Sequence, residues 1–149
     1  MKKLSGLTAV AVLVSLNALA VDYPAKGQNY IICEASTLAL EEGHSLTLLK
    51  SKGFGTVSNP PTQVDCYGTV ESMPDKSFKA SGYCVHTDRD GDKVADRWWA
   101  DSSMPKGKWE DVGISGKYKG LRKSGNYVYT DLSTPTECRG VSNWEVEKQ

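Results

Sequence analysis

The chain has no long apolar run after its first twenty residues. Two lysines near the N-terminus precede the apolar stretch 7–16, and Ala18 and Ala20 supply the small residues of a cleavage site. That stretch is shorter than the ~20 apolar residues of a membrane helix, and no later segment approaches this length. The sequence therefore predicts a removable signal peptide over residues 1–20 and no membrane span.

The chain also lacks an excess of charge of either sign. Without the two N-terminal lysines, 16 basic residues stand against 18 acidic residues. Nucleic acids and anionic membrane surfaces are bound through clustered cationic charge, so this near balance argues against both as partners. No linker or repeat divides residues 21–149, which we expect to form a single domain in a periplasmic or secreted protein.

Motifs of metal binding and catalysis are missing as well. No Cys-x-x-Cys pair is present for a zinc site, and no serine lies in a Gly-x-Ser-x-Gly setting. Gly116-Lys117 superficially suggests a phosphate loop, but Asp111 and Tyr118 stand where such a loop has Gly and Ser or Thr. We therefore predict no catalytic residue, no metal ligand and no cofactor.

Histidine is scarce, with only His44 and His86 in the chain. His86 lies two residues from both Cys84 and Asp88, so the three side chains would share one face of a strand. That arrangement leaves open a metal-binding or acid–base role for His86. An ordinary buried or surface imidazole is the simpler interpretation.

Helical signals are poor, and only residues 35–42 suggest a turn or two of helix before Gly43. The remainder has short segments rich in Val, Ile, Thr, Tyr and Trp, separated by Gly, Pro, Asn and Asp. About eight strands at this spacing predict an all-β fold, a small antiparallel β-barrel, with a sandwich as the alternative. The predicted strands are 28–36, 45–51, 63–71, 78–87, 93–100, 107–113, 117–120, 125–131 and 138–146, and the predicted turns include 52–53, 90–91 and 124–125.

Four cysteines, an even number in a chain with export signals, are typical of two disulfides. Spacing alone leaves three pairings open. If 63–71 and 78–87 form a hairpin centred on Asp75, Cys66 faces Cys84 at the ~4.5–5.5 Å that a disulfide needs. Cys33 then pairs with Cys138 and ties the first strand to the last, as closure of a barrel requires.

The acidic segment 88–93, Asp-Arg-Asp-Gly-Asp-Lys, begins like the calcium loop of an EF-hand. Its sixth and twelfth positions hold Lys and Trp, where that loop needs a turn glycine and a bidentate glutamate. A hairpin with Asp90-Gly91 as a two-residue type I′ turn is therefore favoured, with Asp88 and Asp92 as its solvated flanks. Calcium binding by Asp88, Asp90 and Asp92 stays open.

Aromatic residues gather in the C-terminal half of the chain. Adjacent Trp98 and Trp99 must point to opposite sides of a strand, so one packs inward while the other is exposed or lines a groove. Tyr127 and Tyr129 share a face. These four are the predicted ligand-binding residues, by stacking on a sugar or covering a hydrophobic ligand. Ordinary barrel filling by the same rings is the alternative.

The segment 82–130 combines Asp-x-Asp-Gly-Asp-Lys, a Trp-bearing strand and Gly-Lys-Tyr-x-Gly-x-x-x-Ser-Gly-x-Tyr. This pattern resembles a group of bacterial exported proteins, and its second half is similar to the glycine-rich hairpins of the allene oxide cyclase and dirigent superfamily. The resemblance departs at Arg122-Lys123, in place of a further glycine-containing stretch. It implies an eight-stranded antiparallel barrel with glycines at turns and corners. No cyclase active-site motif matches, so it implies no catalytic residue here.

These observations favour an exported module that binds a small molecule or a partner through the barrel mouth and the Trp/Tyr face. The first alternative is an enzyme of isomerase or cyclase type, with His86 and nearby aspartates in a barrel cavity. Two further alternatives are a structural or inhibitory protein acting through a surface loop, and a calcium-stabilised barrel. The sequence identifies no ligand, substrate or partner.

Overall fold

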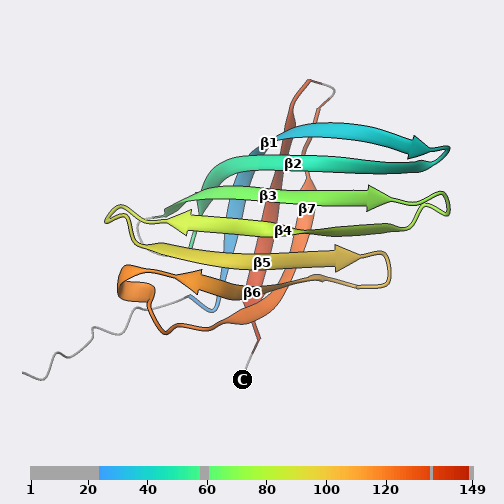
Figure 1. The fold of residues 1–149 in the computed structure, drawn as a ribbon. Coiled ribbons are helices and arrows are strands. Elements are labelled where there is room, and N and C mark those ends of the chain that lie inside the picture. Colours follow the sequence, from blue (N-terminus) through green and yellow to red (C-terminus); the bar gives the residue numbers. More distant parts are fainter. Residues whose placement is uncertain (1–23, 58–60, 135, 148–149) are drawn as a thin grey trace, which may run out of the picture.

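Eight strands form a closed antiparallel barrel in the computed structural model, which describes residues 24–57, 61–134 and 136–147 (Figure 1). Each strand pairs with the next along the chain, and β1 closes the barrel by pairing with β8. The strands are β1 (Lys26–Glu41), β2 (His44–Gly55), β3 (Thr62–Ser72), β4 (Phe78–Thr87), β5 (Lys93–Asp101), β6 (Gly107–Ile114), β7 (Ser124–Asp131) and β8 (Cys138–Val146). The predicted all-β antiparallel barrel of about eight strands is confirmed.

The predicted signal peptide, residues 1–20, lies outside the described part of the chain. Within that part, the one helical element is the short 3-10 helix η1 (Gly116–Tyr118). No helix there has the length and apolar character needed to cross a bilayer.

Strand β1 pairs with two strands, β8 and β2. Its first half pairs with β8, and residues from Asn29 to Glu41 pair with β2. Figure 1 shows the blue start of β1 running beside the red strand β8, and its cyan end lying along β2. The helical turn predicted at 35–42 is therefore wrong. A helix of two turns is too short to be stable by itself, whereas β2 offers these residues a complete antiparallel partner.

Two predicted turns are also wrong, because 52–53 lies inside β2 and 124–125 begins β7. The glycines in them allow close approach between strands instead of a change of direction. A Cβ at Gly53 would lie 1.7 Å from the Tyr30 carbonyl oxygen, so only glycine fits against β1 at this point.

The prediction of a strand at 117–120 is wrong, since the first two of these residues belong to the 3-10 helix η1. Gly116 has φ 60°, in the left-handed region that favours glycine. The Asp92 carboxylate occupies the space that a side chain at Gly116 would need. The glycine that suggested a barrel corner thus brings η1 against the β4–β5 turn.

Both predicted disulfides are confirmed, and both connect residues that face each other on paired strands. Cys66 pairs with Cys84 across β3 and β4, with a Cα–Cα distance of 4.0 Å. Cys33 pairs with Cys138 across β1 and β8, with a Cα–Cα distance of 5.0 Å. Two disulfides are compatible with an oxidising compartment.

Glycines facing large aromatic rings are a recurrent feature of the barrel wall. A Cβ at Gly82, which faces Trp98 across β4 and β5, would lie 2.5 Å from the indole. Each of these rings therefore lies over a bare stretch of backbone on the neighbouring strand, an arrangement that shields the glycine. The glycine–aromatic pairs are Gly82–Trp98, Gly107–Tyr127, Gly125–Trp109 and Gly27–Trp144.

The two ends of the barrel differ. The largest fully buried side chains are Tyr118, Val64, Val94 and Thr62, all near the end where η1 meets the β4–β5 turn. At the other end the wall of the lumen reaches exposed residues, among them Pro105 and Asp131. The lumen is therefore closed by η1 at one end and open to solvent at the other.

Candidate functional site

The barrel lumen is the candidate functional site. It is a cavity of about 570 Å³, within the range of small-molecule sites. Apolar and aromatic side chains make up most of its wall, and both disulfides face it. Its aromatic lining residues are Phe78, Trp98, Trp109, Trp144, Tyr127 and Tyr129.

Three of the four residues predicted to bind ligand line this lumen. Trp98 comes from β5, and Tyr127 and Tyr129 come from β7, where they share a face as expected. Trp99 points to the outer surface, where the Arg97 guanidinium lies 5.0 Å from its ring centroid. The structure thus brings three predicted residues together and separates the fourth, while ligand binding by any of them stays a prediction.

The tryptophans of the lumen form one packed group. Trp109 and Trp144 meet edge to face, with ring centroids 5.8 Å apart. Val57 and Tyr127 pack against this pair, and Trp98 adjoins it. Burial, together with the nearby Asp96 charge, raises the pKa of Tyr127 to about 12. Its hydroxyl is therefore a neutral donor at physiological pH.

A histidine–aspartate pair lies in the lumen wall beside these rings. The His86 Nε2 and Asp96 Oδ2 atoms are 2.8 Å apart, and the His86 side chain is 3% exposed. On the other edge of the ring, Nδ1 lies 3.4 Å from the Thr62 hydroxyl. His86 is therefore held on both sides and fixes the orientation of the Asp96 carboxylate.

A second carboxylate faces Asp96 across β5 and β6. Asp111 is 6% exposed, and its Oδ2 accepts a hydrogen bond of 3.0 Å from the Lys123 backbone N–H. Burial and the Asp96 charge raise the pKa of Asp111 to about 6, although the hydrogen bond from Lys123 and the charges of His86 and Arg122 partly oppose the rise. Among the described residues, Oδ1 has no hydrogen-bond donor.

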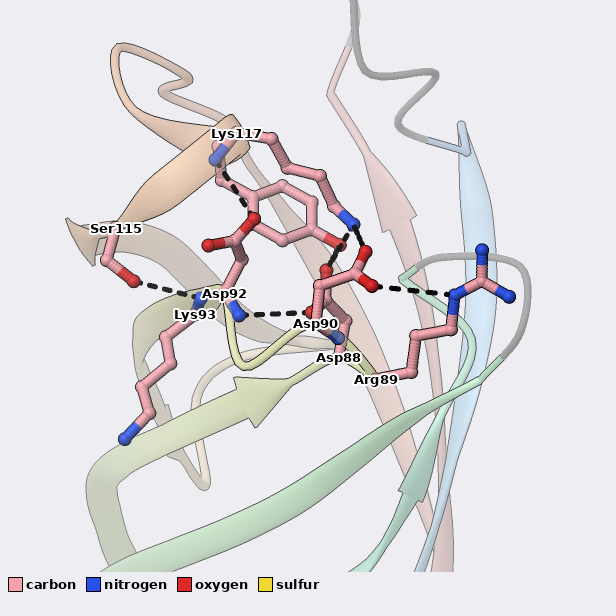
Figure 2. A network of polar contacts seen from close by, with 8 residues as sticks. Asp88, Arg89, Asp90, Asp92, Lys93, Ser115 and Lys117 are labelled. Atoms are coloured by element: carbon pink, nitrogen blue, oxygen red, sulfur yellow. Dashed lines mark hydrogen bonds and ion pairs between the residues drawn. The ribbon is translucent and has the colours of Figure 1, made fainter.

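The sequence placed His86 on one face with Cys84 and Asp88, and all three are buried, but they do not form one site. Cys84 and His86 line the lumen. Asp88 belongs to a separate network at the closed end (Figure 2). The acid–base candidate of the lumen is instead Asp96, which the sequence interpretation did not single out. Asp111 pairs with it across β5 and β6 but does not line the cavity.

The β4–β5 turn differs from its predicted form. Asp88 and Asp92 pair through their backbones, so three residues form the loop rather than two. Only Gly91, at φ 84°, has a positive φ in this turn, which fits a type I turn followed by a left-handed glycine and excludes type I′. Asp88 is also not solvated, since it is 8% exposed.

Asp88 organises the closed end of the barrel. Its carboxylate accepts hydrogen bonds from the backbone N–H groups of Asp90 and Asp92 and from the Tyr118 hydroxyl. Lys117 Nζ lies 2.5 Å from Asp88 and 2.9 Å from Asp90. Dashed lines in Figure 2 mark both contacts. Burial alone would raise the pKa of Asp88, but these contacts outweigh it and lower the pKa.

The Lys117 ammonium thus takes the place beside Asp88 and Asp90 that a cation would need. Within the described ranges, no group of three or more His, Cys, Asp or Glu side chains is arranged to hold a metal ion. The carboxylates of the acidic segment instead fasten η1 to the turn, because Lys117 carries a fixed positive charge at neutral pH.

Comparison with protein-family models, with curated proteins and with solved structures finds no match to this chain. The similarity to bacterial exported proteins and to allene oxide cyclase hairpins therefore stays a prediction.

Proposed function

We propose that this protein binds a small, largely apolar, ring-bearing molecule in the barrel lumen. The observation that carries the proposal is the hollow interior, about 570 Å³ in volume and open at one end. An eight-stranded barrel is just wide enough either to be filled by its own side chains or to hold one small ligand. Here the aromatic rings lie over glycines of the wall, so their faces line the space instead of filling it.

The chemistry of the wall supports such a ligand. Aromatic faces offer flat apolar contact, and a few polar groups at one place give orientation and specificity. The polar groups of this lumen include Asn29, His86 and Asp96, and Trp98 follows Asp96 by two residues on β5. A ligand with a ring and one polar group fits a wall that is mostly aromatic and has polar groups in one region.

We place this function in an exported protein. The two disulfides suit an oxidising compartment, and the N-terminal segment has the composition of a signal peptide. Detection of a mature N-terminus near residue 21 in the periplasm or medium of the producing cells would test this.

Binding can be tested with the neutral dye N-phenyl-1-naphthylamine and excitation of the tryptophans. Ala80→Phe would fill the lumen, because Ala80 lines it, whereas Ser81→Phe places the same ring on the outer face of β4. We expect Ala80→Phe to weaken dye binding by about tenfold or more, equivalent to ~1.4 kcal/mol. Ser81→Phe should leave it nearly unchanged. No saturable binding to the wild type, or equal loss in both variants, would contradict the proposal.

The His86–Asp96 pair supports a second candidate, acid–base catalysis of an isomerisation in the same lumen. A carboxylate oriented by a neighbouring imidazole can move a proton on a bound ligand. Once a ligand is known, incubation with protein followed by chromatography separates the two functions. A ligand recovered unchanged in stoichiometric amount supports binding, and a product that fails to form with His86→Gln supports catalysis.

A further inference from the structure

The charged residues that line the lumen are mainly acidic. They are three carboxylates, of Asp96, Asp101 and Asp131, and one ammonium, of Lys106. Lys106 Nζ lies 2.6 Å from Glu145 Oε1, so its charge is already balanced. Asp131 lies at the exposed mouth, whereas Asp96 is 13% exposed, so inside the lumen an anionic ligand would meet a negative charge that is screened less than in water.

One acceptor atom of the lumen wall, the side-chain oxygen of Asn29, lacks a hydrogen-bond donor among the described residues. This oxygen is near the His86 ring, because a Cβ at Gly55 would contact both Asn29 Oδ1 and His86 Nδ1. His86 itself binds Asp96 Oδ2 from one side. A buried acceptor without a donor is costly, so a ligand that brings N–H groups gains more here than one that brings oxygen acceptors.

Aromatic rings lie beside the polar groups of Asn29, His86 and Asp96. Trp98 follows Asp96 by two residues on β5, so both side chains point into the lumen. Trp109 faces Trp98 across β5 and β6, and Trp144 packs on Trp109. The face of an indole attracts a cation, and the attraction increases when the cation is desolvated. A carboxylate beside several indoles is suited to an ammonium group.

From these three observations we infer that the lumen selects ligands with a protonated amine, the nitrogen lying beside Asp96 and the hydrocarbon part along the tryptophans. The inference deepens the proposed function and rests on it. A neutral ligand of the same size would leave the Asn29 and Asp96 oxygens less well paired. A carboxylate ligand would in addition be repelled by Asp96.

Three probes of similar size test this: 2-phenylethylamine, 2-phenylethanol and 3-phenylpropanoate. Each is titrated as a competitor of N-phenyl-1-naphthylamine at pH 7, where the first is a cation and the last an anion. We expect the amine to bind about tenfold more tightly than the alcohol, and the acid more weakly than both. Equal affinities, or a preference for the acid, would overturn the inference while leaving dye binding and the proposed function in place. Failure of the dye itself to bind would overturn both.

Asp96→Asn supplies the matched test within the protein, with Asp131→Asn as its control at the exposed mouth. Asp96→Asn should reduce the advantage of the amine over the alcohol to about twofold or less, since it removes the charge and keeps the shape. Asp131→Asn should retain it, because solvent screens that carboxylate. An unchanged preference in a folded Asp96→Asn protein overturns the inference. The wild-type comparison of the three probes stands by itself if that variant does not fold.

Discussion

Asp111 is the described residue whose ionisation most clearly opposes folding. It is 6% exposed, faces the Asp96 carboxylate and has only one of its two oxygens hydrogen-bonded among the described residues. We predict that Asp111→Asn stabilises the protein at neutral pH and leaves its stability in acid nearly unchanged. The Asn side chain keeps an oxygen for the Lys123 N–H, and its amide can donate toward Asp96.

The magnitude follows from the pKa of Asp111, which rises from its ordinary value of 3.8 to about 6 in the folded protein. This difference corresponds to ~3 kcal/mol between the two ionisation states. Between these two pH values the folded state binds more protons than the unfolded state, so stability falls as the pH rises. The favourable contribution is therefore complete below about pH 4 and is lost as the pH passes about 6.

The assay is equilibrium unfolding in urea, followed by circular dichroism from pH 3.5 to 7.5 with both disulfides intact. We expect Asp111→Asn and wild type to agree below about pH 4, and the variant to be more stable by up to ~3 kcal/mol above about pH 6. Asp131→Asn is the control, because hydrogen bonds from the Ser133 hydroxyl and backbone N–H lower the pKa of Asp131 and give the opposite sign. A wild-type-minus-variant difference that stays flat with pH would refute the reasoning.

The remaining predictions concern the covalent and steric framework. Replacing both cysteines of Cys33–Cys138 by serine should cost ~1–2 kcal/mol more in urea unfolding than the same change at Cys66–Cys84, because the bonds span 105 and 18 residues; the reverse order would contradict a mainly entropic role. Gly82→Ala should cost ~1–3 kcal/mol, since its Cβ would meet Trp98 and a backbone oxygen, whereas Gly113→Ala, with only an ordinary contact, should be nearly neutral. Lys117→Met should lower the melting temperature by leaving a buried carboxylate without its cation, and added salt should not restore it.

The barrel and its disulfides could be predicted from the sequence because local signals and long-range constraints agree there. The β3–β4 hairpin has the predicted register throughout, and this register places Cys66 opposite Cys84. The turn chemistry, the strand-forming residues and the geometry of a disulfide each favour the same pairing. The prediction of a helical turn at 35–42 was wrong because these residues form a strand by pairing with β2. Local helical preference carries no information about a partner strand.

The lumen site could not be predicted because it depends on the pairing register of β4 and β5. That register changes by one residue according to whether the turn between them has two residues or three. A two-residue Asp90-Gly91 turn would place Cys84 opposite Arg97, and would turn Arg97 and Trp99 inward. The three-residue turn places Cys84 opposite Asp96, so Asp96 and Trp98 face the lumen. A shift of one residue exchanges the two faces of a strand.

Both turns suit the dipeptide Asp-Gly, so the local sequence does not decide between them. The three-residue turn is stabilised by Asp88, whose carboxylate accepts hydrogen bonds from two backbone N–H groups of the turn. Lys117 and Tyr118, from the distant helix η1, bind the same carboxylate. One sequence signal did favour the observed register: burial of Arg97 would be far more costly than burial of Trp98. Weighing the two faces of β5 by this cost would have identified Trp98 as the inward residue.

A hollow barrel has less packing to hold it together than a filled one, and the position of the disulfides offsets this. Only eight hydrophobic residues among those described are buried, and two of them are Cys66 and Cys84. Both disulfides lie in the lumen wall, where a filled barrel would have interlocking side chains. In the chain-entropy model they contribute ~3 and ~4–5 kcal/mol by restricting the unfolded chain, and they add little volume to the interior. Covalent cross-links of this kind stabilise the wall without occupying the space that a ligand needs.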